Sequence, residues 1–165
     1  MGWLERHQEY AILFVPLFAF LETCFVVGIF VSSLFLVIAC SIIYANGWAE
    51  LWLMCLLAML GSSLADHLGF YIGRGLGPGF HHLRLVERNR KKIDKAEALV
   101  RRFGPGAIFI GRFIPAIRSL VPAMMGLTGF ARTRYTPLDL SACGLWACGL
   151  YAIVLGAHEL FLAQS

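Results

Sequence analysis

A long apolar run near the start of the chain limits the fold more than any other feature of this sequence. From Tyr10 to Gly73 the only formal charges are Glu22, Glu50 and Asp66. The chain has 165 residues, of which 59% are hydrophobic, and a mean hydropathy of +0.72. A soluble domain of this length cannot bury so much apolar surface. We therefore predict an all-α integral membrane protein, in which each helical span needs about 20 apolar residues.

Basic residues gather in one stretch between apolar segments. From Arg74 to Pro105, nine basic residues stand against three acidic ones, and the formal net charge of the whole chain is +4. A basic total raises the question of nucleic acid. Because apolar segments flank this stretch, we expect anionic lipid head groups beside it and no nucleic acid. The positive-inside rule places the loop 74–105 in the cytoplasm.

We predict a single membrane domain over residues 1–165. The stretch 10–45 is longer than one span and is interrupted by Pro16 and other breaks, so it reads as a helix followed by a broken or doubled-back segment. The remaining segments are a span at 48–73, a cytoplasmic segment at 74–105, a hairpin at about 106–128 and a last span at 136–161. Within the cytoplasmic segment, apolar residues form a stripe that predicts an amphipathic helix on the membrane surface. The stripe consists of Ile93, Ala96, Leu99, Val100 and Phe103.

The segment 107–127 is apolar but contains two arginines and two prolines. The short loop that follows carries Arg132 and Arg134 and no acid. If the segment crossed the membrane once, this basic loop would fall on the outer side, against the positive-inside rule. If the segment enters and returns, both basic loops share the cytoplasmic face. We therefore expect a re-entrant hairpin.

Arg112 and Arg118 are the candidate substrate-binding residues. On an unbroken helix they would lie about 120° apart around the axis, so one would face lipid, at a cost of about 2.5–3.5 kcal/mol per arginine. A break at Pro115 removes this conflict, because proline cannot donate to Gly111 and its ring clashes there. Both guanidiniums can then point into one cavity, where their fixed donors suit a phosphate or pyrophosphate. The alternative is that both extend to a membrane interface.

Two acids in apolar segments are proton or ion-pair candidates. Glu22 is a titrating proton carrier or a structural partner for Arg112 or Arg118, unless it is an interfacial residue at a helix end. Asp66 lies near the cytoplasmic end of a span, where structural pairing and a role in transport are both open. We expect His67 to contact water or head groups. The five cysteines lie in apolar segments without metal-ligand spacing, so we expect neither a metal site nor a cofactor.

Three stretches carry a resemblance to a known family, and together they cover roughly Phe20 to Ala157. They are Phe20-Leu21-Glu22, the glycine-rich stretch from Gly61 through Asp66 and Tyr71 to Gly77, and the stretch from Gly111 to Arg118, followed by Pro122, Gly126 and Trp146. On these stretches the chain resembles the DedA family, also called the SNARE-associated or VTT-domain superfamily. The third stretch is the most specific.

This resemblance implies two re-entrant hairpins, the first at about 20–45, that meet near the membrane centre in an inverted-repeat-like arrangement. Pro115, Pro122 and Gly126 would interrupt the helices of the second hairpin. The resemblance also implies transport of undecaprenyl phosphate or phospholipids across a bacterial inner membrane, in some members driven by the proton-motive force. The family's essential glutamate corresponds to Glu22 and its essential arginines to Arg112 and Arg118.

The chain departs from the family pattern in two places. A second acid that commonly follows the glutamate is replaced by Leu34, which puts proton coupling through an acid pair in doubt. The sequence also ends at Ser165, without the additional C-terminal span of many members. We expect a pairing partner, such as a second copy in a homo-oligomer, to supply that surface.

These features favour a transporter of a phosphate-bearing lipid. The alternatives are a proton-coupled transporter of small solutes or ions, and an assembly paralogue that transports nothing. An enzyme is not expected, because the sequence has no HExxH motif and no nucleophilic serine motif with a partner histidine.

Overall fold

The computed structural model describes residues 8–24, 33–77, 79, 87–114 and 117–162. These residues form helices and turns, and no strand occurs among them. Two of the described helices contain a 26-residue stretch that is long and apolar enough to cross a membrane, Leu51–Leu76 and Arg132–Ala157. In chain order the helices are α1 Gln8–Thr23, α2 Ser33–Ala45, α3 Leu51–Leu76, α5 Arg90–Phe103, the 3₁₀ turn η3 Gly104–Gly106, α6 Ala107–Arg112, α7 Val121–Leu127 and α8 Arg132–Leu162.

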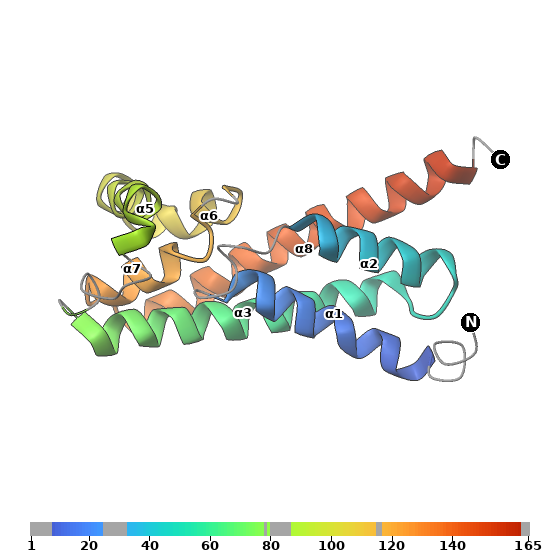
Figure 1. Cartoon of the computed structure of the whole chain (residues 1–165), viewed down its shortest axis with the longest axis horizontal. Helices are drawn as coiled ribbons and strands as arrows, with labels where there is room; N and C mark the ends of the chain where they lie inside the picture. The colour runs from blue at the N-terminus through green and yellow to red at the C-terminus, as the bar shows by residue number, and fades with distance from the viewer. Residues whose placement is uncertain (1–7, 25–32, 78, 80–86, 115–116, 163–165) are drawn as a thin grey trace.

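The long helices α3 and α8 pack together and organise the other elements (Figure 1). The helix α1 packs along α3, and α2 packs against α1 and α8. At the other end of the bundle, α7 packs on α3, α6 packs on α8, and α5 covers both α6 and α7. As a result, the end of α1 and the turn between α6 and α7 approach each other in the middle of the molecule.

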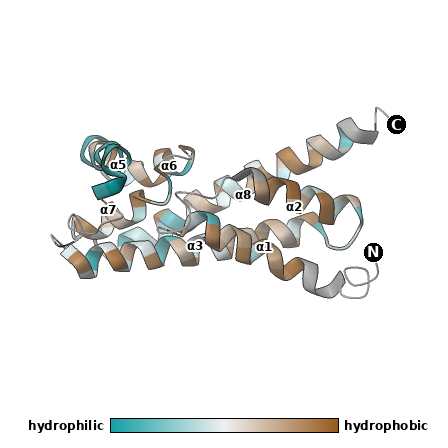
Figure 2. Cartoon of the chain, in the orientation of Figure 1, coloured by the Kyte–Doolittle hydropathy of each residue, from teal (hydrophilic) through white to brown (hydrophobic). Residues whose placement is uncertain are grey.

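The sequence of α3 suits its position in the helical bundle. One side of the helix buries small and polar residues, among them Ala58, Ser62 and Asp66. The other side exposes a large apolar residue at every fourth position: Trp52, Leu56, Leu60, Leu64 and Leu68. Residues four apart lie on the same face of a helix, so this stripe is continuous. Exposed apolar residues also cover α1, α2 and α8 (Figure 2), as expected of helices that face lipid.

Glycines let α3 and α7 approach each other closely. A Cβ atom at Gly73 would collide with the backbone carbonyl of Ala123, and one at Gly126 would collide with the carbonyl of Phe70. In the same way, Gly61 makes room on α3 for the backbone of α1. Gly126 therefore lies within helix α7 as a packing residue and does not break it.

Pro122 also differs from its predicted role. It lies in the first turn of α7 and therefore begins this helix, a position where proline costs no intrahelical hydrogen bond. Between α6 and α7, the described residues 113, 114 and 117–120 are not part of a helix. Pro115, the predicted breaking point, lies outside the described residues.

The amphipathic helix α5 packs mainly on protein. Ile93, Ala96 and Val100 are buried in a cluster that includes residues of α6 and α7, with Leu99 packed at its edge. Only Phe103, which is 44% exposed, remains open on the predicted stripe. The expectation that this stripe rests on the membrane surface is therefore wrong for most of its length, because the second hairpin takes up the apolar face.

The α3–α7 contact gives a direct test of the fold. Gly73→Ala should lower the free energy of unfolding by about 1–3 kcal/mol, the usual cost of overpacking. Gly75→Ala, two residues further along the same helix, has open space around the new methyl group and should leave stability unchanged or slightly raised. Thermal melting of both variants in detergent micelles measures the difference, and an equal effect of the two substitutions would contradict this packing.

Candidate functional site

Two buried arginines of the second hairpin define the polar centre of the molecule. Arg112 is the last residue of α6, and Arg118 lies in the turn that precedes α7. Their side chains are only 4% and 5% exposed. Helix α6 ends at Arg112 and the following residues turn, so the two residues do not continue one helix. This break allows both guanidiniums to face inward.

Arg112 contacts carboxylates from both long helices. Its Nη1 lies 2.5 Å from Oδ2 of Asp66 on α3 and 3.5 Å from Oδ1 of Asp139 on α8. Its Nη2 donates a hydrogen bond to the hydroxyl of Ser62. Both aspartate side chains are 1% exposed, so these groups interact away from water. One guanidinium therefore joins α3, α6 and α8.

Arg118 pairs with the end of α1. Its Nη1 lies 2.5 Å from Oε1 of Glu22, and its Nη2 donates to the Thr23 hydroxyl at 2.7 Å. Its guanidinium carbon also lies 4.8 Å from the ring centroid of Trp146, a cation–π contact. The hydroxyls of Thr23 and Ser62 are 3.1 Å apart, so a chain of hydrogen bonds connects the two arginines.

Both arginines line an apolar cavity of about 220 Å³. The other lining residues come from α2, the second hairpin and α8: Val37, Phe113, Trp146, Gly149, Leu150 and Ile153. Ile153 and Phe113 are both 56% exposed, so the cavity borders the outer apolar surface of the bundle. The arrangement places two phosphate-binding side chains at one side of a space suited to a hydrocarbon chain.

The profile of the VTT domain matches residues 29–156, which include both arginines and Asp66. The chain belongs to the VTT-domain family. This assignment confirms the resemblance to DedA proteins. No solved structure matches the chain.

Several bacterial membrane proteins are similar to this VTT-domain chain. Inner membrane protein YabI of Escherichia coli is 25% identical over 144 residues, covering 87% of this chain and 57% of YabI. Inner membrane protein YqjA of the same species is 28% identical over 160 residues, covering 93% of this chain and 70% of YqjA. Membrane protein ML0467 of Mycobacterium leprae is 35% identical over 94 residues, covering 57% of this chain and 38% of ML0467.

The chain thus spans little more than half the length of YabI. The names of YabI and YqjA support a location in a bacterial inner membrane.

The VTT-domain structure brings together five of the residues singled out from sequence. Glu22 lies against Arg118, and Asp66 lies against Arg112. Pro122 lines a small cavity beside both arginines. Leu34 belongs to α2, but its side chain is not among those described. Pro115 lies outside the described residues.

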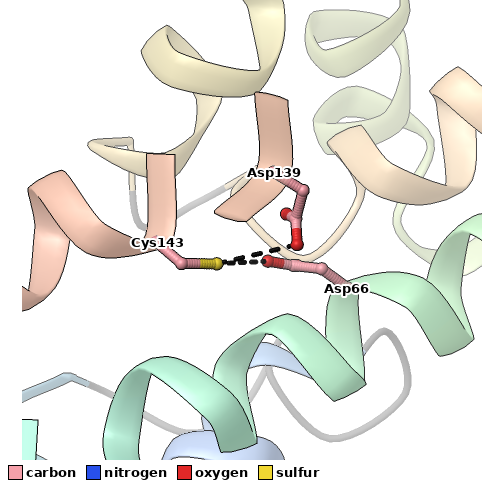
Figure 3. Close-up of side chains that lie close together, drawn as sticks. All are labelled: Asp66, Asp139 and Cys143. Carbon is pink, nitrogen blue, oxygen red and sulfur yellow. Dashed lines mark hydrogen bonds between the residues drawn. The ribbon is translucent and has the colours of Figure 1, made fainter. Parts of the chain in front are cut away.

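Asp139 was not predicted from the sequence. It is fully buried on α8, where Ser63 donates to its Oδ2 at 2.8 Å and His67 Nδ1 lies 3.5 Å away. Cys143 places its sulfur 3.7 Å from the same oxygen (Figure 3). The available signal was an acid inside a predicted apolar span, the same criterion that identified Glu22 and Asp66. His67 also differs from expectation, because its ring contacts this buried network.

Removing Arg112 should reveal how strongly the buried charges depend on one another. Arg112→Met leaves two buried carboxylates without their guanidinium, which should cost about 3–5 kcal/mol of stability. Adding Asp66→Asn should restore part of that loss, because it removes one uncompensated charge. The exposed pair of Arg90 and Asp94, 3.8 Å apart, offers a control, since Arg90→Met should cost at most about 1 kcal/mol. Melting temperatures of the variants in detergent measure these differences. A double variant no more stable than Arg112→Met would contradict the pairing of Arg112 with Asp66.

Proposed function

We propose that this chain is a membrane transporter that moves a phosphate-bearing lipid, such as undecaprenyl phosphate or a phospholipid, across the bacterial cytoplasmic membrane. The observation that supports this proposal is the pair of buried guanidiniums beside an apolar cavity of about 220 Å³. Guanidinium groups bind phosphate oxygens through paired hydrogen bonds. The apolar lining then suits the part of the lipid that follows the head group.

The carboxylates give the site a way to bind and release its ligand. In the observed arrangement, Glu22 contacts Arg118, and Asp66 contacts Arg112. A phosphate that reaches Arg118 takes the place of Glu22, and the displaced carboxylate takes up a proton because it is otherwise buried without compensation. The guanidinium keeps an anionic partner throughout the exchange. Release reverses this exchange. Compensation matters because moving one charge across a membrane potential costs about 2.3 kcal/mol per 100 mV.

The lengths of the hairpin helices support a re-entrant arrangement. The helices α6 and α7 contain 6 and 7 residues, which corresponds to roughly 10 Å each at 1.5 Å per residue. A hydrocarbon core is about 30 Å thick, so neither helix can cross it. Arg74, at the end of α3, donates to the carbonyl of Phe130 at 3.1 Å, so the two basic segments lie at the same end of the bundle.

The order of the elements suggests how the two halves of the protein relate. A helical pair, α1 and α2, precedes the long helix α3, and a second pair, α6 and α7, precedes the long helix α8. The end of α1 meets the α6–α7 turn through Glu22 and Arg118. We propose that both pairs are re-entrant hairpins of an inverted repeat and that their relative movement exposes the arginines to either membrane side.

Topology can be tested with single cysteines. Lys95 on α5 and Thr133 at the start of α8 are both exposed. If the second hairpin returns to the cytoplasmic face, Lys95→Cys and Thr133→Cys in a background without native cysteines should both react with a membrane-impermeant maleimide only in inside-out vesicles. Labelling of the two cysteines from opposite sides would show that the segment 107–127 crosses the membrane once.

Transport itself can be measured in proteoliposomes. Arg118→Ala should reduce translocation of a fluorescent phosphate lipid to the level of empty liposomes, because the head group loses a bidentate partner. Arg90→Ala, on the exposed side of α5, should keep wild-type transport. A wild-type rate in the folded Arg118→Ala protein would exclude this arginine from the site.

A second candidate is a proton-coupled transporter of small solutes or ions. The carboxylates of Asp66 and Asp139 beside Arg112 favour it, because buried acids inside a membrane protein commonly serve proton pathways. This second candidate predicts pH-dependent flux of the solute in liposomes to which no phosphate-lipid substrate has been added. The apolar lining of the larger cavity favours the lipid.

A further inference from the structure

The group of charges around Arg112 contains more acid than base. Asp66 and Asp139 both lie within 3.5 Å of its Nη1. Arg118 has its own acidic partner, Glu22. A buried carboxylate that is not compensated is strongly unfavourable and takes up a proton instead. The charge balance therefore requires one additional proton in this group.

Among the described residues, the titratable groups that face Asp139 come from three helices. Asp66 and His67 come from α3, Arg112 comes from α6, and Cys143 and Tyr135 come from α8 itself; Arg118 lines the same small cavity. The ligand atoms of Asp66, Asp139 and Cys143 all lie within 4.8 Å of one another (Figure 3). Such a set resembles a metal site, but the Arg112 guanidinium occupies the position beside both carboxylates that a cation would need. A proton is the ligand that remains compatible with this geometry.

A small cavity next to the carboxylates points to the same conclusion. It has a volume of about 10 Å³ and is lined by Asp66, Arg112, Tyr135 and Asp139, among others. The Tyr135 hydroxyl, Nε of Arg112 and Oδ1 of Asp139 all lie in the buried part of the structure and have no hydrogen-bond partner in it. Tyr135 is fully buried. A cavity of this size beside unsatisfied polar atoms accommodates about one water molecule, which can donate to Asp139 and accept from Tyr135.

His67 connects this group to the outside. Its side chain is 22% exposed, whereas that of Asp139 is 1% exposed. Its Nδ1 lies 2.8 Å from the carbonyl of Ser63, an oxygen that can only accept, so Nδ1 carries the hydrogen. The same Nδ1 lies 3.5 Å from Oδ2 of Asp139. Its Nε2 lies 3.1 Å from the Thr136 hydroxyl. When Nε2 takes up a proton by way of this hydroxyl, Nδ1 can pass its own proton to Asp139 and the ring returns to neutral.

We propose that Asp66 and Asp139 form a proton-binding site that exchanges one proton with water through His67, and that occupancy of this site sets how tightly Arg112 is held. Protonation leaves Arg112 with one ionised partner, and deprotonation gives it two. The consequence for transport rests on the proposed lipid transport, whereas the proton site itself does not.

Infrared spectroscopy of the purified protein in lipid nanodiscs tests the proton site directly. We expect the carbonyl stretch of a protonated carboxyl group, which loses intensity as the pH rises and is lost from the spectrum of Asp139→Asn. Asp94→Asn, an exposed acid on α5 that is 61% exposed, serves as the control and should keep the band. A band that is the same in wild type, Asp66→Asn and Asp139→Asn, or no titrating band in wild type, overturns the proposal.

The histidine has a separate kinetic test that does not depend on the stability of the aspartate variants. His67→Gln should keep the carboxyl band but slow its hydrogen–deuterium exchange by about tenfold or more, because the ring no longer relays the proton. Unchanged exchange in His67→Gln would exclude His67 as the route.

Transport assays separate this proposal from the proposed function. The folded Asp139→Asn protein should still move the phosphate lipid but lose the pH dependence of wild-type transport, whereas Arg118→Ala should lose transport at every pH. A wild-type pH profile in Asp139→Asn counts against control of transport by this site. A titrating carboxyl band in a wild-type protein that moves no lipid would support the proton site and reject lipid transport.

Discussion

The fold depends on how two arginines are neutralised inside an apolar helical bundle. Each guanidinium draws partners from different helices: Arg112 from α3 and α8, and Arg118 from α1. Because an isolated arginine in hydrocarbon is so unfavourable, the second hairpin is stable only where these acids surround it. The close α3–α7 contact, made possible by Gly73 and Gly126, holds this hairpin beside α3. Helix packing and charge pairing thus require each other.

The two arginines differ in what surrounds them. Arg118 pairs with Glu22 and stacks on Trp146, next to the apolar cavity that suits a lipid. Arg112 reaches the carboxylates of α3 and α8 and the network that leads to His67. Both arginines line the apolar cavity, Arg112 in addition contacts the proposed proton site, and the Thr23–Ser62 hydrogen bond links the two arginines. A change of charge at one arginine can therefore affect the other arginine through a short path of polar groups.

Much of this architecture could be predicted from sequence, because the decisive signals are local. Apolar length defined the span at 48–73, which corresponds closely to α3 at Leu51–Leu76, and the apolar stripe before Gly104 defined α5. Pairings between residues far apart in the chain were harder to predict. The sequence left open whether Glu22 pairs with Arg112 or Arg118, because nothing in local spacing decides between them. Asp139 is an acid inside the predicted span at 136–161, but its role could not be predicted, because Arg112 and Ser63, which pair with it, lie more than twenty residues away on other helices.

The existing ion pairs also determine which anions the cavity can select. Since each arginine already contacts a carboxylate, a small anion such as inorganic phosphate meets no excess positive charge and gains little by replacing one partner with another. The tail of a lipid keeps it in the membrane, at about 0.8 kcal/mol for each methylene held out of water, so the phosphate of the proposed lipid substrate is present beside the cavity at a high local concentration. With Val37, Leu150 and Ile153 lining the cavity, the tail can stay in apolar surroundings while the head group reaches the arginines. Under the proposed function, selectivity against soluble phosphates thus arises from the tail, although the arginines would contact only the head group.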